Sequence, residues 1–358
     1  MSSKANARRM ARCDRLDMCN EYDKLVPNPP VWTAMKHAEY CDLAISEYEK
    51  NRTESTVMAK LNSHDPSRTA SDIRISLKGQ VIKKDEKRHK KEAIPGQLIH
   101  EYDIAHTLND APFALFMENE IFDAFPGNFI FYRRMNPSQF IEIYKARWRV
   151  GNGVHTSDVT RWDVGCDAGV LNFDVHVMHR SKFPKDYIEA YIHRRLNSRS
   201  QHGPMATMQN SGDRYTWAIN SLRRAVVASL INDVTNEDTV AINGDDEAID
   251  RFCTSKPFRD SAWEFKNQNG LTGEFSGYTL GGPVPLYSAE GIHYRALILE
   301  SRDPSAQDKW LNYMDLLGWA DLNDPMALAV ATTAQRHMKP DLFWQALPKP
   351  LHIHFEQR

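Results

Sequence analysis

The sequence of 358 residues lacks any apolar run near the ~18 residues that a membrane-spanning helix needs. It also lacks a strong charge of either sign, because 45 basic and 47 acidic residues leave a formal net charge of −2. A chain with so balanced a charge is not, as a whole, a basic nucleic-acid binder. Any attraction for phosphate must therefore come from basic residues that cluster locally. The sequence contains no internal repeat and no low-complexity linker.

Cysteine is also scarce. The five cysteines lie at Cys13, Cys19, Cys41, Cys166 and Cys253, and no C-x-x-C pair occurs. An odd number of scattered cysteines indicates reduced thiols in a cytosolic setting and no structural metal site. The remaining composition, 41% hydrophobic and 26% charged, is ordinary for a soluble globular protein. The length suffices for two or three subdomains or for one large fold with a shared core.

The most informative stretch is AINGDDEAID, residues 241–250. Two short apolar segments flank Gly244, Asp245 and Asp246, which is typical of a β-hairpin. Gly244 allows the positive φ that a tight turn needs. Adjacent carboxylates repel each other unless a cation lies between them, and Mg²⁺ prefers such oxygen ligands. The alternative interpretation is an ordinary Asn-Gly turn with solvated acids.

The one dense basic cluster lies in residues 78–91, where seven of fourteen residues are basic. The candidate phosphate-binding residues in it are Lys78, Lys83, Lys84 and Arg88. A cluster of this kind favours a phosphate-binding surface. A solvated charged turn is the alternative interpretation, and it is left open by the pattern alone.

Two further segments carry polar residues at suggestive spacing. Asp158 and Asp163 are five residues apart, which fits a transition from a strand to a helix. Ser211 and Gly212 form a flexible loop that leads into a predicted helix. Thr216 and Asn220 lie four residues apart on that helix, so they share a face. The alternative for these two side chains is a buried polar pair without a functional role.

Elsewhere the hydrophobic pattern predicts the elements around these motifs. Helices are expected over 31–50, 112–125 and 183–199, and Asn136-Pro137 is expected to begin another. Strands are expected at 73–77, 129–134 and 293–300. Three helices are expected after Asp303.

These motifs together resemble the RNA-dependent RNA polymerases of positive-strand RNA viruses. The similarity is greatest to the tymovirus-like and flexivirus-like branch of the alphavirus-like group. The resemblance rests on an ordered series covering roughly residues 70 to 300. The series is KGQVIKK with PGQ behind it, Asp158-x4-Asp163, Ser211-Gly212-x3-Thr216-x3-Asn220, Gly244-Asp245-Asp246, Lys266 in EFKNQ, and GEFSGYTL.

The resemblance implies an α+β fold, a right-hand polymerase with an antiparallel-sheet palm, fingers and a small helical thumb. The implied segments are an N-terminal part with fingers and fingertips (1–110), a fingers–palm connection (111–155), a palm (156–302) with a fingers insertion near 176–210, and a thumb (303–358). Polymerases of this group usually lie behind capping and helicase domains in a polyprotein. This chain has neither, so a separate product or a trimmed piece is expected.

The resemblance also implies roles for the motif residues. Asp158, Asp245 and Asp246 would bind Mg²⁺, with Mn²⁺ as a substitute, for nucleotidyl transfer. Lys266 would act as a general acid toward the departing pyrophosphate. The implied nucleotide-binding residues are Lys78, Lys83, Lys84, Arg88, Asp163, Ser211, Gly212, Thr216 and Asn220.

The implied partners are an RNA template and its product strand, nucleoside triphosphates and other viral replication proteins. The implied location is the host cytoplasm, within viral replication complexes. The chain departs from its relatives after Asp163, where Val164, Gly165, Cys166 and Asp167 replace a common D-Q-S-Q. Two alternatives stay open: a reverse transcriptase or DNA polymerase with the same palm, and an RNA-binding scaffold without catalysis.

Overall fold

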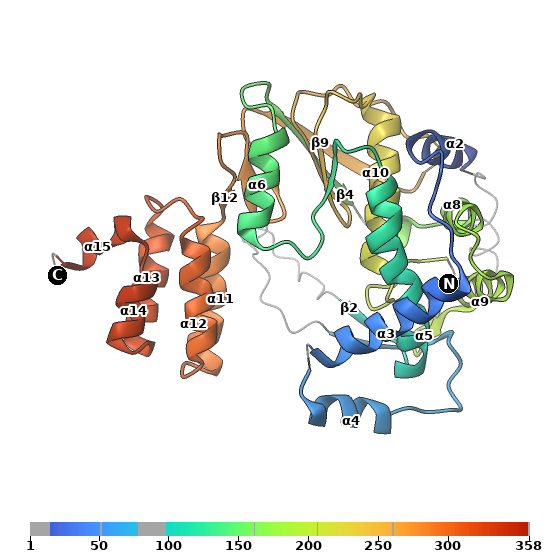
Figure 1. Ribbon diagram of the computed structural model, residues 1–358, viewed down its shortest axis with the longest axis horizontal. Helices are drawn as coiled ribbons and strands as arrows, with labels where there is room; N and C mark the ends of the chain where they lie inside the picture. The colour runs from blue at the N-terminus through green and yellow to red at the C-terminus, as the bar shows by residue number, and fades with distance from the viewer. Residues whose placement is uncertain are drawn as a thin grey trace. The chain divides into compact units, whose positions relative to one another are not determined.

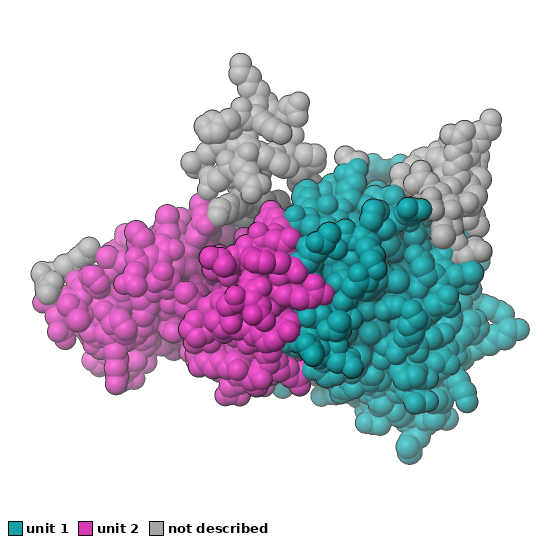
Figure 2. All heavy atoms as spheres, turned by 90° about the horizontal axis from the view of Figure 1, so that it is seen from above, with its two compact units in different colours: residues 1–133, 157–247, 253–267 teal, residues 134–156, 248–252, 268–358 magenta. Residues whose placement is uncertain are grey.

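The computed structural model describes residues 15–50, 52–77, 98–160, 162–205, 207–259 and 261–356. The chain divides into two compact units, drawn in teal and magenta in Figure 2. Unit 1 holds residues 1–133, 157–247 and 253–267, and unit 2 holds residues 134–156, 248–252 and 268–358. Among the helices in the described ranges, none is long and apolar enough to cross a membrane.

Unit 1 is largely helical (Figure 1). Its helices are α2 (Leu16–Leu25), α3 (Ala34–Lys50), α4 (Glu54–Asn62), α5 (Ile104–Phe116), π-helical η2 (Met117–Ile121), 3₁₀-helical η3 (Phe122–Ala124), α7 (Trp162–Gly165), α8 (Ala168–Arg180), α9 (Lys185–Asn197) and α10 (Thr216–Asn232). Helix α10 is buried without interruption from Ala218 to Ser229, as expected of a helix enclosed on all sides. It therefore offers a rigid base for the polar residues at its first turns.

A five-stranded sheet carries the predicted hairpin. Its strands are β3 (Phe129–Phe131), β4 (Val154–Thr160), β7 (Val240–Asn243), β8 (Asp246–Ile249) and β9 (Glu264–Gly270), in the order β3-β7-β8-β4-β9. Strands β7 and β8 are neighbours, which confirms the hairpin. The sheet is not antiparallel throughout, because β3 and β7 run parallel, with Phe129 opposite Val240. The long connection between them imposes no reversal, as a tight turn would.

A second sheet, formed by residues of unit 1, has the order β2-β1-β5-β6. Its strands are β1 (Asp72–Leu77), β2 (Leu98–Glu101), β5 (Arg199–Ser200) and β6 (Gly203–Pro204). Strands β1 and β2 pair antiparallel, with Leu77 opposite Leu98. The basic segment between these two positions lies outside the described residues.

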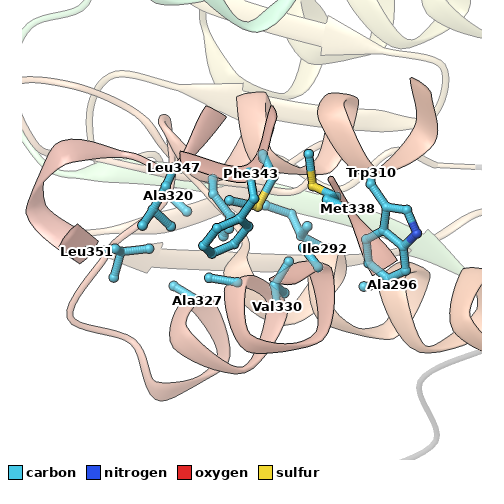
Figure 3. Packing of buried hydrophobic residues seen from close by; sticks show 14 of the residues in the cluster. Ile292, Ala296, Trp310, Ala320, Ala327, Val330, Met338, Phe343, Leu347 and Leu351 are labelled. Carbon is cyan, nitrogen blue, oxygen red and sulfur yellow. The ribbon is translucent and has the colours of Figure 1, made fainter. Parts of the chain in front are cut away.

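Unit 2 contains a small sheet and a helical group. Its elements are α6 (Pro137–Arg147), β10 (Gly273–Phe275), β11 (Tyr278–Leu280), β12 (Leu286–Tyr287), α11 (Ala289–Arg302), α12 (Gln307–Leu317), α13 (Pro325–His337), α14 (Pro340–Ala346) and α15 (Lys349–Glu356). Helices α11 to α15 share a buried core in which Trp310, Ile292 and Phe343 are almost fully enclosed (Figure 3).

Helix α11 corrects one expectation, because residues 293–300 were expected as a strand. The side chain of Ser288 caps the helix by accepting a hydrogen bond of 3.2 Å from the backbone N–H of Gly291. Ile292, Ala296 and Leu299 recur at helical spacing and are all buried. These side chains form the buried face of the helix, whereas Arg295 and Leu297 between them are exposed. The fold as a whole is a mixture of helices and sheets.

Candidate active site

A pocket of about 590 Å³ in unit 1 gathers most of the predicted motif residues. It is lined by Thr107, Asp163, Ser211, Gly212, Asp213, Arg214, Thr216, Trp217, Asn220, Asn243, Gly244, Asp245 and Asp246. These residues come from four places: helices α5 and α7, the start of α10 with the loop before it, and the turn between β7 and β8. The sequence motifs that were predicted to act together thus meet in space.

The turn between β7 and β8 is fixed by helix α10. Gly244 has a φ of 63°, the left-handed conformation that glycine adopts without strain. Its backbone N–H donates to Ser221 Oγ at 2.9 Å. One residue earlier, Asn243 Oδ1 accepts a hydrogen bond of 2.6 Å from the indole Nε1 of Trp217. Two contacts from one rigid helix therefore hold Asp245 and Asp246 in place.

Asp163 and Asn220 form a direct pair in the pocket. Asn220 Nδ2 donates to Asp163 Oδ1 at 2.9 Å. Arg223 Nη1 donates to Asn220 Oδ1 at 3.0 Å, which fixes which end of the amide faces the carboxylate. Burial raises the pKa of Asp163, although the hydrogen bond from Asn220 and the charge of Arg223 partly offset this.

The hydroxyl group of Thr216 makes two hydrogen bonds within the protein. Its hydroxyl donates to the backbone carbonyl of Asn210 at 2.6 Å and accepts from Gln209 Nε2 at 3.1 Å. The backbone N–H of Gln209 in turn donates to the carbonyl of Asp163 at 3.0 Å. Thr216 therefore ties the loop before α10 to the segment that carries Asp163.

The Ser211-Gly212 loop lies against strand β2. The backbone N–H of Ser211 donates to His100 Nδ1 at 3.3 Å, so this ring nitrogen carries no proton. Burial lowers the pKa of His100, which favours the same neutral form. A Cβ atom built on Gly212 would lie 1.6 Å from the carbonyl oxygen of His100. Only glycine allows the loop this close to the strand.

The remaining predicted catalytic residues stand on neighbouring strands. Asp158 on β4 lies 3.4 Å from Lys266 Nζ on β9, and both side chains are about three-fifths exposed, at 62% and 61%. The pKa of Asp245 is raised, chiefly by partial desolvation of a residue that is still exposed, and the negative charges of Asp163 and Asp158 add to this. Asp158 is therefore close enough to Asp245 for the two carboxylates to repel each other.

This gathering of like charges fits a divalent cation. Within the described ranges, no three or more His, Cys, Asp or Glu side chains approach closely enough to form a complete protein cage. Mg²⁺ does not need such a cage, because it is commonly bound through one or two carboxylates together with waters and substrate phosphates. Asp158 and Asp245 suit that mode of binding.

Several lining residues were missed at the level of sequence. Asp213 and Arg214 directly follow Gly212, and Asn243 directly precedes Gly244, so proximity to a motif was the available signal. Trp217 follows Thr216 in the same way. Thr107 on α5 has no comparable signal. Of the predicted residues, Lys78, Lys83, Lys84 and Arg88 lie outside the part of the chain that the structure describes.

Comparison with known proteins identifies the family. A family model described as RNA dependent RNA polymerase matches residues 20–271, and the chain belongs to this family. The predicted class, an RNA-directed RNA polymerase, is therefore confirmed at the level of the family. The flexivirus-like resemblance is confirmed as well.

Three viral relatives illustrate the similarity. The RNA replication protein of Botrytis virus F is 29% identical over 200 residues, which cover 56% of this chain and 10% of that protein. The RNA replication protein of Narcissus mosaic virus is 26% identical over 207 residues, 58% of this chain and 12% of that protein. The RNA-directed RNA polymerase of Apple chlorotic leaf spot virus is 24% identical over 208 residues, 58% and 11% respectively. The chain thus spans about a tenth of the length of these curated relatives.

Proposed function

We propose that this chain is a viral RNA-directed RNA polymerase that copies RNA by template-directed nucleotidyl transfer from nucleoside triphosphates. The observation that carries the proposal is the pocket of about 590 Å³, in which Asp163, Ser211, Asn220 and Asp245 come together from segments far apart in the sequence. Membership in the polymerase family supports the same conclusion.

The proposed architecture is a right hand. The palm would be residues 156–302, which carry helix α10 and strands β7, β8 and β9 of the five-stranded sheet, together with most of β4. The fingers would come from residues 1–110 and from an insertion near 176–210, joined to the palm through 111–155. The thumb would be residues 303–358, where α12 to α15 pack with α11 around one buried core. A palm that holds its carboxylates on a sheet and a buried helix suits a reaction that depends mainly on positioning.

Asp158 and Asp245 would hold Mg²⁺, or Mn²⁺ as its substitute, with Asp246 as a weaker third ligand. Bound there, such ions would supply activation of an attacking hydroxyl and neutralisation of developing charge. Lys266 Nζ lies 3.4 Å from the Asp158 carboxylate. As a general acid, its ammonium group would donate a proton to the leaving pyrophosphate.

The sugar of the incoming nucleotide would be recognised by the Asp163–Asn220 pair. The raised pKa of Asp163 reflects a carboxylate partly removed from water, where a hydrogen bond to a ribose hydroxyl is strengthened. Ser211 and Gly212 would form the loop beneath the new base pair. The basic residues Lys78, Lys83, Lys84 and Arg88 are proposed to contact the triphosphate.

The proposed partners are the RNA template, the product strand, nucleoside triphosphates and other viral replication proteins. The proposed location is the host cytoplasm, within replication complexes.

The first prediction tests this function by single-nucleotide incorporation. Purified wild-type protein with Mg²⁺ should extend a primer on an RNA template by the matching ribonucleotide. Asp245→Asn should reduce the rate by at least ~10³-fold, because it removes charge from the proposed metal site, whereas Asp246→Asn should cost less. Asp233→Asn is the matched control, since Asp233 is an exposed aspartate paired with Lys256 away from the pocket.

Near wild-type extension by Asp245→Asn would show that the catalytic assignment is wrong. Preferential use of deoxyribonucleotides would favour the DNA polymerase alternative. RNA binding without any incorporation would favour the scaffold.

A further inference from the structure

The pocket has one basic side chain among its described lining residues. Four aspartates contribute to its wall, namely Asp163, Asp213, Asp245 and Asp246, and Arg214 is the single basic residue there. Such a wall repels a phosphate group unless positive charge is supplied. A fixed guanidinium supplies that charge independently of pH, since arginine stays protonated in proteins.

Arg214 is anchored from behind by a buried carboxylate. Its Nη1 lies 3.0 Å from Glu118 Oε1. The Glu118 side chain is 4% exposed, whereas that of Arg214 is 25% exposed, so the pair has a buried end and an end that reaches the pocket. A guanidinium carries five N–H donors in a planar fork, and a contact through Nη1 leaves donors for a second anion.

The anchor sits in an unusual helix. Glu118 belongs to the π-helical turn η2 between α5 and η3. Single π-helical turns are rare and occur frequently at functional sites. In this protein the π-helical turn carries the buried Glu118, whose partner Arg214 lines the proposed active site. The turn therefore helps to position a side chain of the pocket.

A second pocket meets the first at Arg214. This smaller cavity of about 170 Å³ lies between α3 and α5 and shares Thr107 and Arg214 with the larger pocket. Its lining includes Arg52, whose guanidinium stacks 3.9 Å from the centre of the Tyr48 ring. Arg214 thus faces two adjoining cavities, and a second arginine lines the smaller one.

We propose that Arg214 binds a phosphate of the polymerisation substrates, and that Glu118 is the positioning residue that aims its guanidinium. The inference rests on the proposed polymerase function and adds a residue to it. The phosphate belongs either to the incoming triphosphate or to the RNA backbone, and the two sources share the same oxyanion chemistry. Both match the bidentate geometry of arginine.

The test compares three proteins with the wild type. The double variant Arg214→Gln/Glu118→Gln removes the positive charge without leaving a buried carboxylate unpaired, which guards against unfolding. Arg214→Lys keeps the charge but loses the fork. Arg336→Gln is the control, because Arg336 pairs with Glu300 in unit 2, outside the pocket. Thermal unfolding is measured for each protein.

Two readouts separate the sources of phosphate. One is the KM for ATP against kcat in single-nucleotide incorporation, and the other is the affinity for a fluorescein-labelled RNA oligonucleotide across a salt series. If Arg214 binds the triphosphate, the double variant raises the KM about tenfold and leaves RNA affinity unchanged. If it binds the RNA backbone, RNA affinity falls about tenfold and the log–log salt slope flattens by ~0.7. In either case Arg214→Lys should change the KM or the RNA affinity by less than the double variant does.

The proposal is overturned if the double variant incorporates nucleotide with unchanged KM and unchanged RNA affinity. It is equally overturned if only kcat and the unfolding temperature fall, because that result marks a purely structural pair. Failure of the wild type to incorporate nucleotide counts against the proposed function alone. Direct binding of ATP and of the RNA oligonucleotide then still tests Arg214.

Discussion

At the scale of single residues, Asn220 is held on both ends of its amide. Its nitrogen donates to Asp163 at 2.9 Å and its oxygen accepts from Arg223 at 3.0 Å. A side chain fixed in this way cannot turn to suit a ligand, so any sugar that fits must match it. A site built to bond a hydroxyl rejects the analogue that lacks one, because its own polar groups are left unpaired.

The second prediction follows from this pair. Asn220→Ala should lower the ratio of ribonucleotide to deoxyribonucleotide incorporation about tenfold, because ribonucleotides are used more slowly. The measurement is competitive incorporation of matched ribo- and deoxyribonucleotides. Asn197→Ala is the control, because Asn197 is exposed and bonds only the backbone of α9. An unchanged ratio, or equal use of both sugars by the wild type, would contradict the assignment.

The third prediction concerns Lys266. Its contact with Asp158 joins two exposed side chains, and pairs of this kind contribute only ~0–1 kcal/mol to stability. Lys266→Gln should therefore leave the unfolding temperature unchanged while slowing incorporation about 10²-fold or more, as loss of a general acid does. Lys256→Gln, which breaks the similarly exposed contact with Asp233, is the matched control. Equal rates for the two variants would show that Lys266 is a surface lysine only.

At the scale of elements, two glycines of the pocket differ in why they must be glycine. Gly212 packs against a strand backbone, whereas Gly244 adopts a positive φ with nothing within 4 Å of an added Cβ. The first restriction is a collision with a carbonyl group that cannot move aside. The second is a conformational preference worth roughly 1–2 kcal/mol.

The fourth prediction uses this difference. Gly212→Ala should displace the loop from His100 and reduce incorporation more than Gly244→Ala, which should cost roughly 1–2 kcal/mol of stability at most. Thermal unfolding and single-nucleotide incorporation on both variants provide the comparison. A Gly212→Ala protein that matched the wild type in both measurements would mean that the loop does not depend on this close approach.

Elements whose signals are local could be predicted from the sequence. The hairpin around Gly244 depends on a few neighbouring residues. The helix begun by Asn136 is confirmed, with a capping box formed by Asn136 and Gln139. The strand predicted at 293–300 is wrong because a short apolar run fits a strand as well as a buried helix. Only the packing of Ile292 and Ala296 distinguishes the two structures.

The candidate site was predictable only in part, for the same reason. Thr216 and Asn220 share a helical face because of their spacing, so their common position in the pocket followed from sequence. The contact of Gly212 with His100 and that of Arg214 with Glu118 join residues about a hundred positions apart. No local pattern marks such partners, because they are set by how the elements pack together.

At the scale of the whole molecule, the balanced net charge of −2 conceals several buried ion pairs. Arg223 contacts Asp174, Arg224 contacts Glu247, and Arg194 contacts Asp110, all in unit 1 and all nearly inaccessible to water. Breaking a buried pair leaves an uncompensated charge and is strongly destabilising. Charged residues in this protein therefore form ion pairs inside the fold as well as at its surface.

Asp110 offers the clearest case among these pairs. Its carboxylate lies 2.8 Å from Arg194 Nη2 and 3.1 Å from His106 Nε2, and it accepts a hydrogen bond of 2.8 Å from Tyr187. Burial alone would raise the pKa of Asp110, but Arg194, His106 and Tyr187 together bring it below its ordinary value. The ionised form is thus favoured in the folded state, and it links α5 to α9.

The fifth prediction is that Asp110→Asn destabilises the fold by about 3 kcal/mol at pH 7. A carboxyl whose pKa is lowered on folding stabilises the protein above its unfolded pKa of about 3.9. That contribution disappears as the pH falls through the lower folded value, so the difference between wild type and variant should shrink in acid. Urea unfolding at pH 7 and in a descending pH series measures it.

Asp303→Asn is the control for this experiment, because Asp303 pairs at 3.4 Å with Lys309 and both side chains are exposed, at 49% and 60%. Solvent screening limits the contribution of such a surface pair to ~1 kcal/mol or less. Equal losses of unfolding free energy for the two variants would show that burial does not increase the contribution of Asp110 to stability. A difference that grew as the pH fell would reverse the sign of the argument, because it would require a carboxyl whose pKa is raised on folding.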